Sequence, residues 1–209
     1  MTYSIVARDP KTGALGVATA TAGPAVGALV PHVRAGIGAV ATQAMTNPYL
    51  AFDGLEKLGS MAAKSAMAAA LAVDAEHDRR QVIMIDRYGE TAAWTGSLCD
   101  GFAGHLQGVD VAVAGNLLTG PTVLQAMMEA FRGEDLGERL LAALVAGEAA
   151  GGDRRGTSSA ALKVYSNQQF ADVDLRVDWS ARPLPALAEL MEKTLSGGYA
   201  DFFADVTRR

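Results

Sequence analysis

The sequence predicts an α+β protein built as a four-layer αββα sandwich of mainly antiparallel sheets. Three observations support this fold: hairpin patterns recur along the chain, one strand lacks any polar face, and helices come in pairs after groups of strands. Strict alternation of strand and helix, which is typical of a doubly wound parallel sheet, does not occur. Strands that are apolar on both faces need cover above and below, which two stacked sheets with outer helices supply.

The N-terminal region predicts a hairpin and a third strand. Residues 3–9 and 14–20 favour strands, and the sequence PKTG between them is typical of a turn. Residues 36–44 lack in-out polar alternation, which indicates a strand covered on both faces. Residues 12–33 carry no formal charge, but glycines and Pro24 interrupt the run, so we expect neither a secretory leader nor a membrane span there.

Two helices and three strands are expected next. Asn47 can cap a helix over 46–59, and Ser60 is expected to begin a second helix over 60–74. Residues 80–96 predict a strand, a turn and a strand, and residues 109–118 predict a further strand.

The C-terminal half predicts a second helix pair, two strands and a final helical region. The helices are expected over 120–133 and 135–152, where glycines end the second one. Strands are expected over 159–166 and 172–179, and the helical region over 183–206.

Composition predicts one domain over residues 1–209, because 209 residues with 50% hydrophobic content fill one core well. The net charge of -5 leaves no basic excess for a nucleic acid backbone. The single cysteine, Cys99, fits a reducing compartment, so the cytoplasm is expected. His32, His77 and His105 are too scattered for metal-ligand spacing, so no metal is expected.

The sequence also gives expectations about cofactors, binding partners and oligomeric state. No P-loop, dinucleotide fingerprint or G-x-S-x-G elbow occurs, so no cofactor is expected. The expected partner is a small molecule that carries an amide or a carboxylate, and neither a nucleic acid nor a membrane is expected. Apolar helix positions, among them Phe202 and Phe203, exceed what one monomer is expected to cover, which favours a homo-oligomer such as a homodimer.

Five stretches of the chain resemble one known family. They are SIVARDPKTGALGVA, GIGAVATQAMTNP, GNLLTGP, GGDRRGTSSAAL and VDLRVD. Together they resemble the family called domain of unknown function 1028 (DUF1028), which is grouped with the N-terminal nucleophile (Ntn) hydrolases. The resemblance covers nearly the whole chain and implies the same αββα sandwich, but no particular substrate.

The Ntn resemblance also implies a mechanism. In that superfamily the first residue of the mature chain attacks an amide, and its own α-amino group serves as the base. Such an amine titrates near pH 7.7 to 8.0, roughly, so a neutral fraction can accept the hydroxyl proton. The start of the glycosylasparaginases is similar to TYSIV with Thr2 as the nucleophile. The small subunit of the gamma-glutamyl transpeptidases is similar to the run from Tyr3 to Val6, and this register places the nucleophile before Met1.

Thr2 and Ser4 are the first candidate site residues. Thr2 is either the nucleophile or a β-branched residue at a strand start whose small size favours removal of Met1. While Met1 is attached, the nitrogen of Thr2 is an amide and cannot act as a base. Ser4 alternates onto the same strand face as Thr2 and is either a site hydroxyl or a buried serine.

The other candidates lie further along the chain. Arg154 or Arg155 is expected either to clamp a substrate carboxylate or to pin its own loop by pairing with Asp153. Asn116 either supplies an oxyanion-hole amide or forms a turn. By the superfamily resemblance alone, Thr42 and Gln43 are expected at the site. The alternative for these two is a structural role in the strand.

Two functions of different class follow from these candidates. The first is an Ntn-type amidohydrolase in which Met1 is removed and Thr2 attacks a small amide. The second is a binding or assembly module that keeps the fold without turnover and recognises a small acidic ligand.

Overall fold

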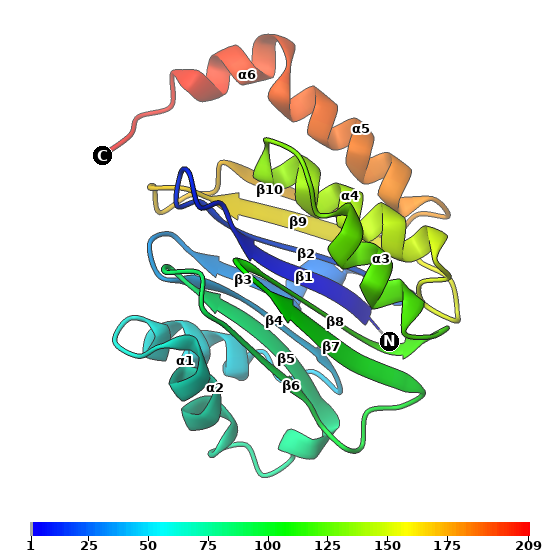
Figure 1. Ribbon diagram of the computed structural model, residues 1–209. Helices are drawn as coiled ribbons and strands as arrows, with labels where there is room; N and C mark the ends of the chain where they lie inside the picture. The colour runs from blue at the N-terminus through cyan, green and yellow to red at the C-terminus, as the bar shows by residue number, and fades with distance from the viewer. Residues whose placement is uncertain (1) are drawn as a thin grey trace.

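Two antiparallel sheets stack face to face with helices on both outer sides, as seen in the computed structural model, which describes residues 2–209 (Figure 1). Met1 lies outside the described residues. The larger sheet has six strands and the smaller has four, and every neighbouring pair is antiparallel. The predicted αββα sandwich is therefore confirmed.

The six-stranded sheet has β1 and β2 near its centre. Its strands in spatial order are β10 (Val173–Val177), β9 (Ser159–Tyr165), β2 (Leu15–Thr21), β1 (Thr2–Arg8), β8 (Val111–Leu118) and β7 (Phe102–Gly108). The strands of the four-stranded sheet in spatial order are β3 (Pro31–Arg34), β4 (Gly38–Ala44), β5 (Arg80–Asp86) and β6 (Thr91–Thr95).

Helices cover the outer face of each sheet (Figure 1). The four-stranded sheet is covered by α1 (Tyr49–Leu58) and α2 (Ala63–Leu71). The six-stranded sheet is covered by α3 (Thr122–Ala130), α4 (Leu136–Ala149) and α5 (Pro183–Leu195), and α6 (Gly197–Ala204) follows α5. Two short 3-10 turns are η1 (Val26–Ala28) and η2 (His77–Arg79). Within residues 2–209, none of the helices combines the length and the apolar character that crossing a membrane requires.

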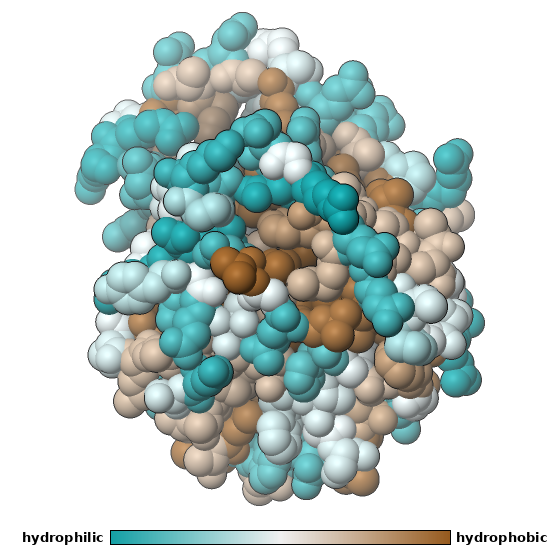
Figure 2. All heavy atoms as spheres, viewed as in Figure 1, coloured by the Kyte–Doolittle hydropathy of each residue, from teal (hydrophilic) through white to brown (hydrophobic). Residues whose placement is uncertain are grey.

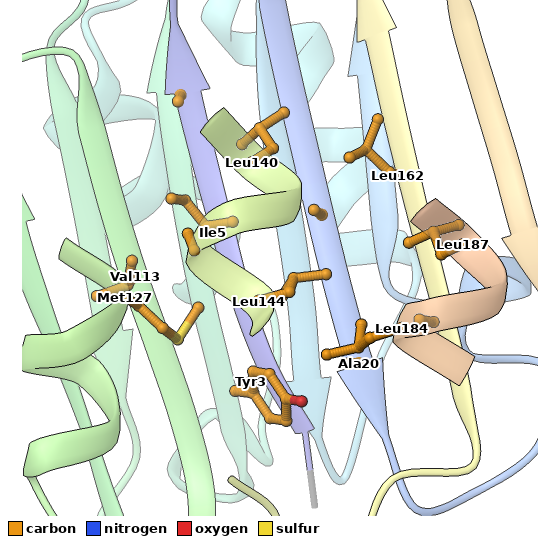
Figure 3. Close-up of a cluster of buried hydrophobic side chains, with 14 of the residues drawn as sticks. Tyr3, Ile5, Ala20, Val113, Met127, Leu140, Leu144, Leu162, Leu184 and Leu187 are labelled. Atoms are coloured by element: carbon orange, nitrogen blue, oxygen red, sulfur yellow. The ribbon is translucent and has the colours of Figure 1, made fainter. Parts of the chain in front are cut away.

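The layer between the six-stranded sheet and its helices is the larger apolar core (Figure 3). Tyr3 and Ile5 project from β1 toward Leu144 of α4 and Met127 of α3. Alternate residues of β1 face the helix layer and the others face the second sheet, which explains why most residues of β1 are apolar. Figure 2 shows hydrophilic, intermediate and apolar residues mixed over the visible face, with strongly apolar ones gathered near its centre.

The layer between the two sheets is apolar along most of its length and polar at one end. Val6 of β1, Ala41 of β4 and Ile83 of β5 are fully buried in its apolar part. In the same phase along their strands, Ser4, Gln43 and Gln81 also face this layer. On each of these strands, the inter-sheet layer therefore changes within two residues from apolar side chains to hydroxyl or carboxamide groups.

The first hairpin fixes the register that brings the polar end together. Asp9 Oδ1 accepts hydrogen bonds from the backbone N–H groups of Lys11 and Thr12 at 2.8 and 2.9 Å. Gly13 closes the turn with a φ of +77°, a left-handed backbone that glycine adopts without steric cost. With this turn in place, β1 and β2 pair so that their far ends meet at Thr2.

Two strands and one helix start differ from the sequence prediction. The strands β3 and β7 were not predicted: β3 is only four residues long and begins with proline, and β7 carries glycines in place of an apolar pattern. Both are edge strands, where packing demands least of the sequence. Ser60 does not begin the second helix, because α2 starts at Ala63 and the Ser60 hydroxyl donates back to the carbonyl of Lys57.

Candidate active site

The polar end of the inter-sheet layer is a network of carboxamide and hydroxyl groups. We call it the amide network and define it by Thr2 and Ser4 of β1, Gln43 of β4, Gln81 of β5 and Asn116 of β8, all of which are buried. Four strands from two sheets thus each place a polar side chain in one small volume. The side chains are neutral, so their burial avoids the penalty of burying unpaired charge, provided that their hydrogen bonds are made.

Gln81 is the centre of the amide network. Its Oε1 accepts from Gln43 Nε2 at 2.8 Å and from Asn116 Nδ2 at 3.0 Å. Its Nε2 lies 2.9 Å from the carbonyl oxygen of Gly115, 3.0 Å from that of Gly104 and 3.0 Å from Thr95 Oγ1. One side chain therefore ties both sheets together at this end.

Sequence reasoning missed Gln81. A signal for it existed, because in RQVIMID this glutamine shares the strand phase of Ile83 and Ile85, which face the inter-sheet core. A carboxamide in phase with two core isoleucines indicates a buried polar group, and such groups need partners.

Thr2 is held at the edge of the network. Gln43 Nε2 donates to the carbonyl oxygen of Thr2 at 3.2 Å, and Asn116 Nδ2 donates to the same oxygen at 3.5 Å. The Thr2 hydroxyl lies 3.2 Å from the hydroxyl of Thr21, its partner across the β1–β2 ladder. Thr2 is only 6% exposed, so both its backbone and its hydroxyl occupy defined positions.

The structure brings Ser4 into the network and leaves Thr42 outside it. Ser4 Oγ donates to Gln43 Oε1 at 2.5 Å and lies 2.8 Å from Thr19 Oγ1. Thr42 faces the opposite side of β4 from Gln43, and its hydroxyl donates to the carbonyl oxygen of Asn47. Of the two neighbouring residues expected at the site, only Gln43 lies beside Thr2.

A pocket of about 330 Å³ adjoins the network at Asn116. We call it the Asn116 pocket; its lining residues are Ala44, Met45, Arg79, Leu98, Cys99, Asp100, Asn116 and Leu117. Its walls come from the ends of β4 and β8 and from the segment that links β6 to β7. A small ligand in this pocket would lie next to the side chain that bonds the Thr2 carbonyl.

The backbone at the pocket is strained in two places. Ala44, directly after Gln43, has a φ of 68°, and Leu117, directly after Asn116, has a φ of 52°. Left-handed backbone costs a non-glycine residue of order 1–3 kcal/mol and tends to occur where function requires a fixed geometry. The N–H of Leu117 donates to the carbonyl oxygen of Asp100 at 2.9 Å, which helps to hold this geometry.

A buried ion pair supports the β4 side of the pocket. Arg80 Nε donates to Asp74 Oδ2 at 2.9 Å, with both side chains 8% exposed, and Arg80 NH1 donates to the carbonyl oxygen of Met45 at 2.7 Å. The hydrogen bonds from Arg80, with a further one from Asn47, lower the pKa of Asp74 from 3.8 to about 2 in spite of its burial. Asp74 therefore stays ionised and keeps Arg80 against the pocket wall at neutral pH.

Cys99 is the one thiol of the chain, and it lines the same pocket. Its Sγ donates to the carbonyl oxygen of Arg80 at 3.4 Å. Burial raises the pKa of the Cys99 thiol, so the reactive thiolate form is disfavoured.

The loop after α4 places its two arginines differently. Asp153 is buried; its Oδ2 accepts from the backbone N–H of Ala22 at 3.0 Å, and its Oδ1 accepts from that of Arg155 at 2.7 Å. The guanidinium group of Arg155 lies 3.5 Å from the same carboxylate. The expected pairing within the loop is therefore present for Arg155. Arg154 instead bonds the carbonyl oxygen of Leu117 through its backbone N–H, next to the Asn116 pocket.

The same loop contacts the Thr2 end of the six-stranded sheet. The N–H of Ser158 donates to the carbonyl oxygen of Thr21 at 2.8 Å, and the hydroxyl of Tyr3 lies 3.4 Å from that of Thr157. Burial, together with the nearby charges of Glu148 and Asp153, raises the pKa of Tyr3, so its phenol stays neutral. The predicted loop and the predicted N-terminal residue are thus neighbours in space.

No metal centre is found within residues 2–209, because no three His, Cys, Asp or Glu side chains gather closely enough to hold an ion. His105 lies beside the network instead, with Nδ1 2.9 Å from Thr95 Oγ1, and burial lowers its pKa. Among residues 2–209, the side chains recorded as bonding Thr2 are the amides of Gln43 and Asn116 and the hydroxyl of Thr21.

The family of unknown function DUF1028 matches this chain over residues 2–187. The crystal structure of protein SPO2555 from Silicibacter pomeroyi, whose description carries the same family, is 35% identical and superposes with a TM-score of 0.93 over 98% of this chain and 91% of that chain. Anbu (ancestral beta-subunit) from Yersinia bercovieri is 10% identical, with a TM-score of 0.47 over 99% of each chain, a level that has no bearing on function. A search of curated proteins gives no match. By its family match and by its likeness to the Silicibacter protein, the chain belongs to the DUF1028 family.

Proposed function

We propose that this protein hydrolyses a small amide by an Ntn-type mechanism, with Thr2 as the N-terminal nucleophile after removal of Met1. The observation that supports the proposal best is the placement of Thr2. This residue starts a central strand, its carbonyl oxygen accepts from Gln43 and Asn116, and its neighbour Asn116 lines a pocket. Positioning of this kind is what an attacking group needs, because loss of orientation slows an intramolecular attack strongly.

The nucleophile and the proposed base are both groups of residue 2. The hydroxyl oxygen adds to the carbonyl carbon of the amide while the free α-amine takes the hydroxyl proton. The amine then gives that proton to the leaving nitrogen as the C–N bond breaks, which leaves an ester on Thr2. Water, with its proton taken by the same amine, hydrolyses the ester and restores the hydroxyl. The side chains that bond Thr2, those of Thr21, Gln43 and Asn116, are neutral, which favours this role, since a carboxylate bonded to the amine would hold it in its protonated form.

Two further side chains have proposed roles. The Nδ2 group of Asn116 donates to Gln81 at 3.0 Å and, more weakly, to the carbonyl oxygen of Thr2 at 3.5 Å. The N–H of the weaker bond is the one proposed to donate to an oxyanion in the pocket. Arg154, whose backbone bonds Leu117 at the pocket, is the proposed reader of a substrate carboxylate. Arg155 is proposed to stabilise its own loop by pairing with Asp153.

The test compares one polypeptide with the Thr2 nitrogen blocked and free. A cleavable leader that ends directly before Thr2 gives the blocked form, and its removal gives the free form, as checked by intact mass. The free form should hydrolyse members of a panel of small amides at least ~100-fold faster than the blocked form, because only a free amine can act as base. Equal rates in the two forms would move the chemistry away from Thr2.

Matched variants of the free form locate the chemistry further. Thr2→Ala should abolish turnover, whereas Thr91→Ala, which removes another buried threonine hydroxyl at the opposite end of the sandwich, should not. Arg154→Met should raise the KM for amides that carry a carboxylate by about 10-fold with little change in kcat. The exposed Arg132→Met is the control for that loss of charge.

One observation favours the second function, a binding module without turnover. The Thr2 hydroxyl already contacts Thr21, and Gln43 uses both amide protons within the network. A protein that only binds would retain an acidic ligand unchanged in both the blocked and the free form. The same leader experiment, read by ligand binding as well as by turnover, separates the two functions.

A further inference from the structure

A second pocket lies at the opposite end of the sandwich from Thr2. It has a volume of about 860 Å³ and runs along β3, the edge strand of the four-stranded sheet, between α1 and β9. We call it the β3–β9 pocket. The lining residues that matter for its chemistry are His32, Arg34, Phe52, Glu56, Lys163 and Tyr165. A volume of this size accommodates a whole small organic molecule.

Lys163 is the most unusual of these residues. It shares the strand phase of Ala161, which lies in the inter-sheet core, and it pairs across the ladder with Val17 of the same core. Its side chain is only 20% exposed. Within residues 2–209, the ammonium group forms one ion pair, with Asp174 at 3.7 Å, and that partner side chain is 42% exposed. An inward-facing cation with one distant, solvated partner keeps most of its capacity to bind an anion.

Other groups add to the positive character of this pocket. Arg34 is exposed at the pocket and makes no ion pair with any residue of the described chain. Burial lowers the pKa of His32 and the charge of Lys163 lowers it further, so the imidazole is a neutral partner. Glu56 is the one carboxylate among the described lining residues, and Asp174, the ion-pair partner of Lys163, lies outside the lining.

The pocket also offers flat apolar surface. The ring of Phe52 meets the imidazole of His32 edge-on, with centroids 5.0 Å apart, and 54% of Phe52 remains exposed. Tyr165 lies two residues after Lys163 on the same strand face, and burial raises the pKa of its phenol. A ring placed on this surface would bury apolar area without displacing any ion pair.

We propose that the β3–β9 pocket binds a small organic monoanion that carries a flat ring. Its anionic group contacts Lys163 and Arg34, and its ring packs on Phe52. A single negative charge suits the two cations, because Glu56 and Asp174 disfavour a second one by repulsion. Carboxylates and phosphate diesters are monoanions that share this chemistry. The proposal is independent of Thr2, because the pocket and the amide network lie at opposite ends of the inter-sheet layer.

The experiment titrates the full chain with benzoate, methyl phenyl phosphate and benzamide, and binding is followed by calorimetry and by the NMR signals of His32. Benzoate or methyl phenyl phosphate, both of them monoanions, should bind, and the tighter of the two identifies the anion. Benzamide, which has the same ring and no charge, should bind at least ~10-fold more weakly. Anion binding should weaken with added salt and should raise the measured pKa of His32, because the anion offsets the charge of Lys163.

Variants that remove a positive charge test whether the anion binds at Lys163 and Arg34. Lys163→Met keeps an aliphatic side chain of similar length and should weaken anion binding at least ~10-fold, and Arg34→Met should weaken it in the same direction. Lys64→Met is the matched control, because Lys64 lines a different and mainly apolar pocket of about 440 Å³ beneath α2. An unchanged affinity in Lys163→Met, equal affinities for benzoate and benzamide, or no binding of either anion up to about 10 mM would overturn the proposal. Thermal unfolding of each variant shows that the variant is folded.

Discussion

The two ends of the inter-sheet layer solve the problem of buried polarity in opposite ways. At the Thr2 end, Gln43 and Asn116 both donate to Gln81, and the five described residues of the amide network are all uncharged. At the other end, Lys163 faces inward with a single distant carboxylate, and the space beside it is a pocket. The same sandwich thus has one end closed by neutral groups and one end that leaves a cation accessible.

The difference teaches which end holds the fold and which end is free to bind. A satisfied network of neutral amides stabilises one arrangement, because losing any member leaves its partners buried and unpaired. An incompletely paired cation at an open edge contributes little to stability, because water and counterions can replace its partner. Changes at the two ends should therefore have very different effects on unfolding.

The largest effect is expected from Gln81→Leu. This change removes the acceptor of Gln43 and Asn116 and the donor to Gly115 and Gly104, and all four groups lie in the buried layer or beside it. At about 1–3 kcal/mol for each buried group left unpaired, we expect the free energy of unfolding to fall by roughly 3 kcal/mol or more. Urea denaturation followed by circular dichroism measures this loss.

The exposed Gln125 of α3 provides the control for that substitution. Gln125→Leu changes the same atoms on the surface and should stay within about 0.5 kcal/mol of the wild type. If Gln81→Leu were as mild as Gln125→Leu, the amide network would not be what stabilises the Thr2 end.

A smaller, pH-dependent effect is expected from the ion pair that supports the Asn116 pocket. The pKa of Asp74 is about 2 in the folded chain, below its ordinary 3.8. Its contribution to stability is therefore complete above about pH 4 and is lost as the pH falls through 2, and it amounts to about 2 kcal/mol. Asp74→Asn should be less stable at neutral pH, and its difference from the wild type should shrink between pH 4 and pH 2. Parallel unfolding curves at both pH values would contradict this, and Asp201→Asn on α6 is the surface control.

The fold was predictable wherever burial forces a pattern on the sequence. Strands β1, β2, β4 and β5 are covered on both sides, so their middle residues are mostly apolar and lack the polar alternation of a half-exposed strand. Strands β3 and β7 have almost no fully buried residues and carry no such pattern, which is why they were missed. The formation of β3 and β7 therefore depends on pairing with their neighbouring strands and not on local sequence propensity.

Individual residues of the candidate site could be predicted from the sequence, but their arrangement across the two sheets could not. Thr2, Ser4, Gln43 and Asn116 were singled out one at a time, and the structure brings them together. What the sequence lacked was the cross-sheet register, because nothing in a single chain states which glutamine of one sheet meets which asparagine of the other. Gln81 shows this: its importance comes entirely from partners on β4 and β8.

The smallest effect is expected from Lys163→Met, measured as stability without any ligand. Methionine keeps the aliphatic part of the side chain against Val17 and removes a cation whose carboxylate partner lies 3.7 Å away and can be solvated. The free energy of unfolding should therefore change by less than about 0.5 kcal/mol. A loss above roughly 2 kcal/mol in urea denaturation would mean that Lys163 is part of the framework, as Gln81 is. A small change, set beside the large one at Gln81, would show that the fold does not depend on this inward charge, which leaves it available to a ligand.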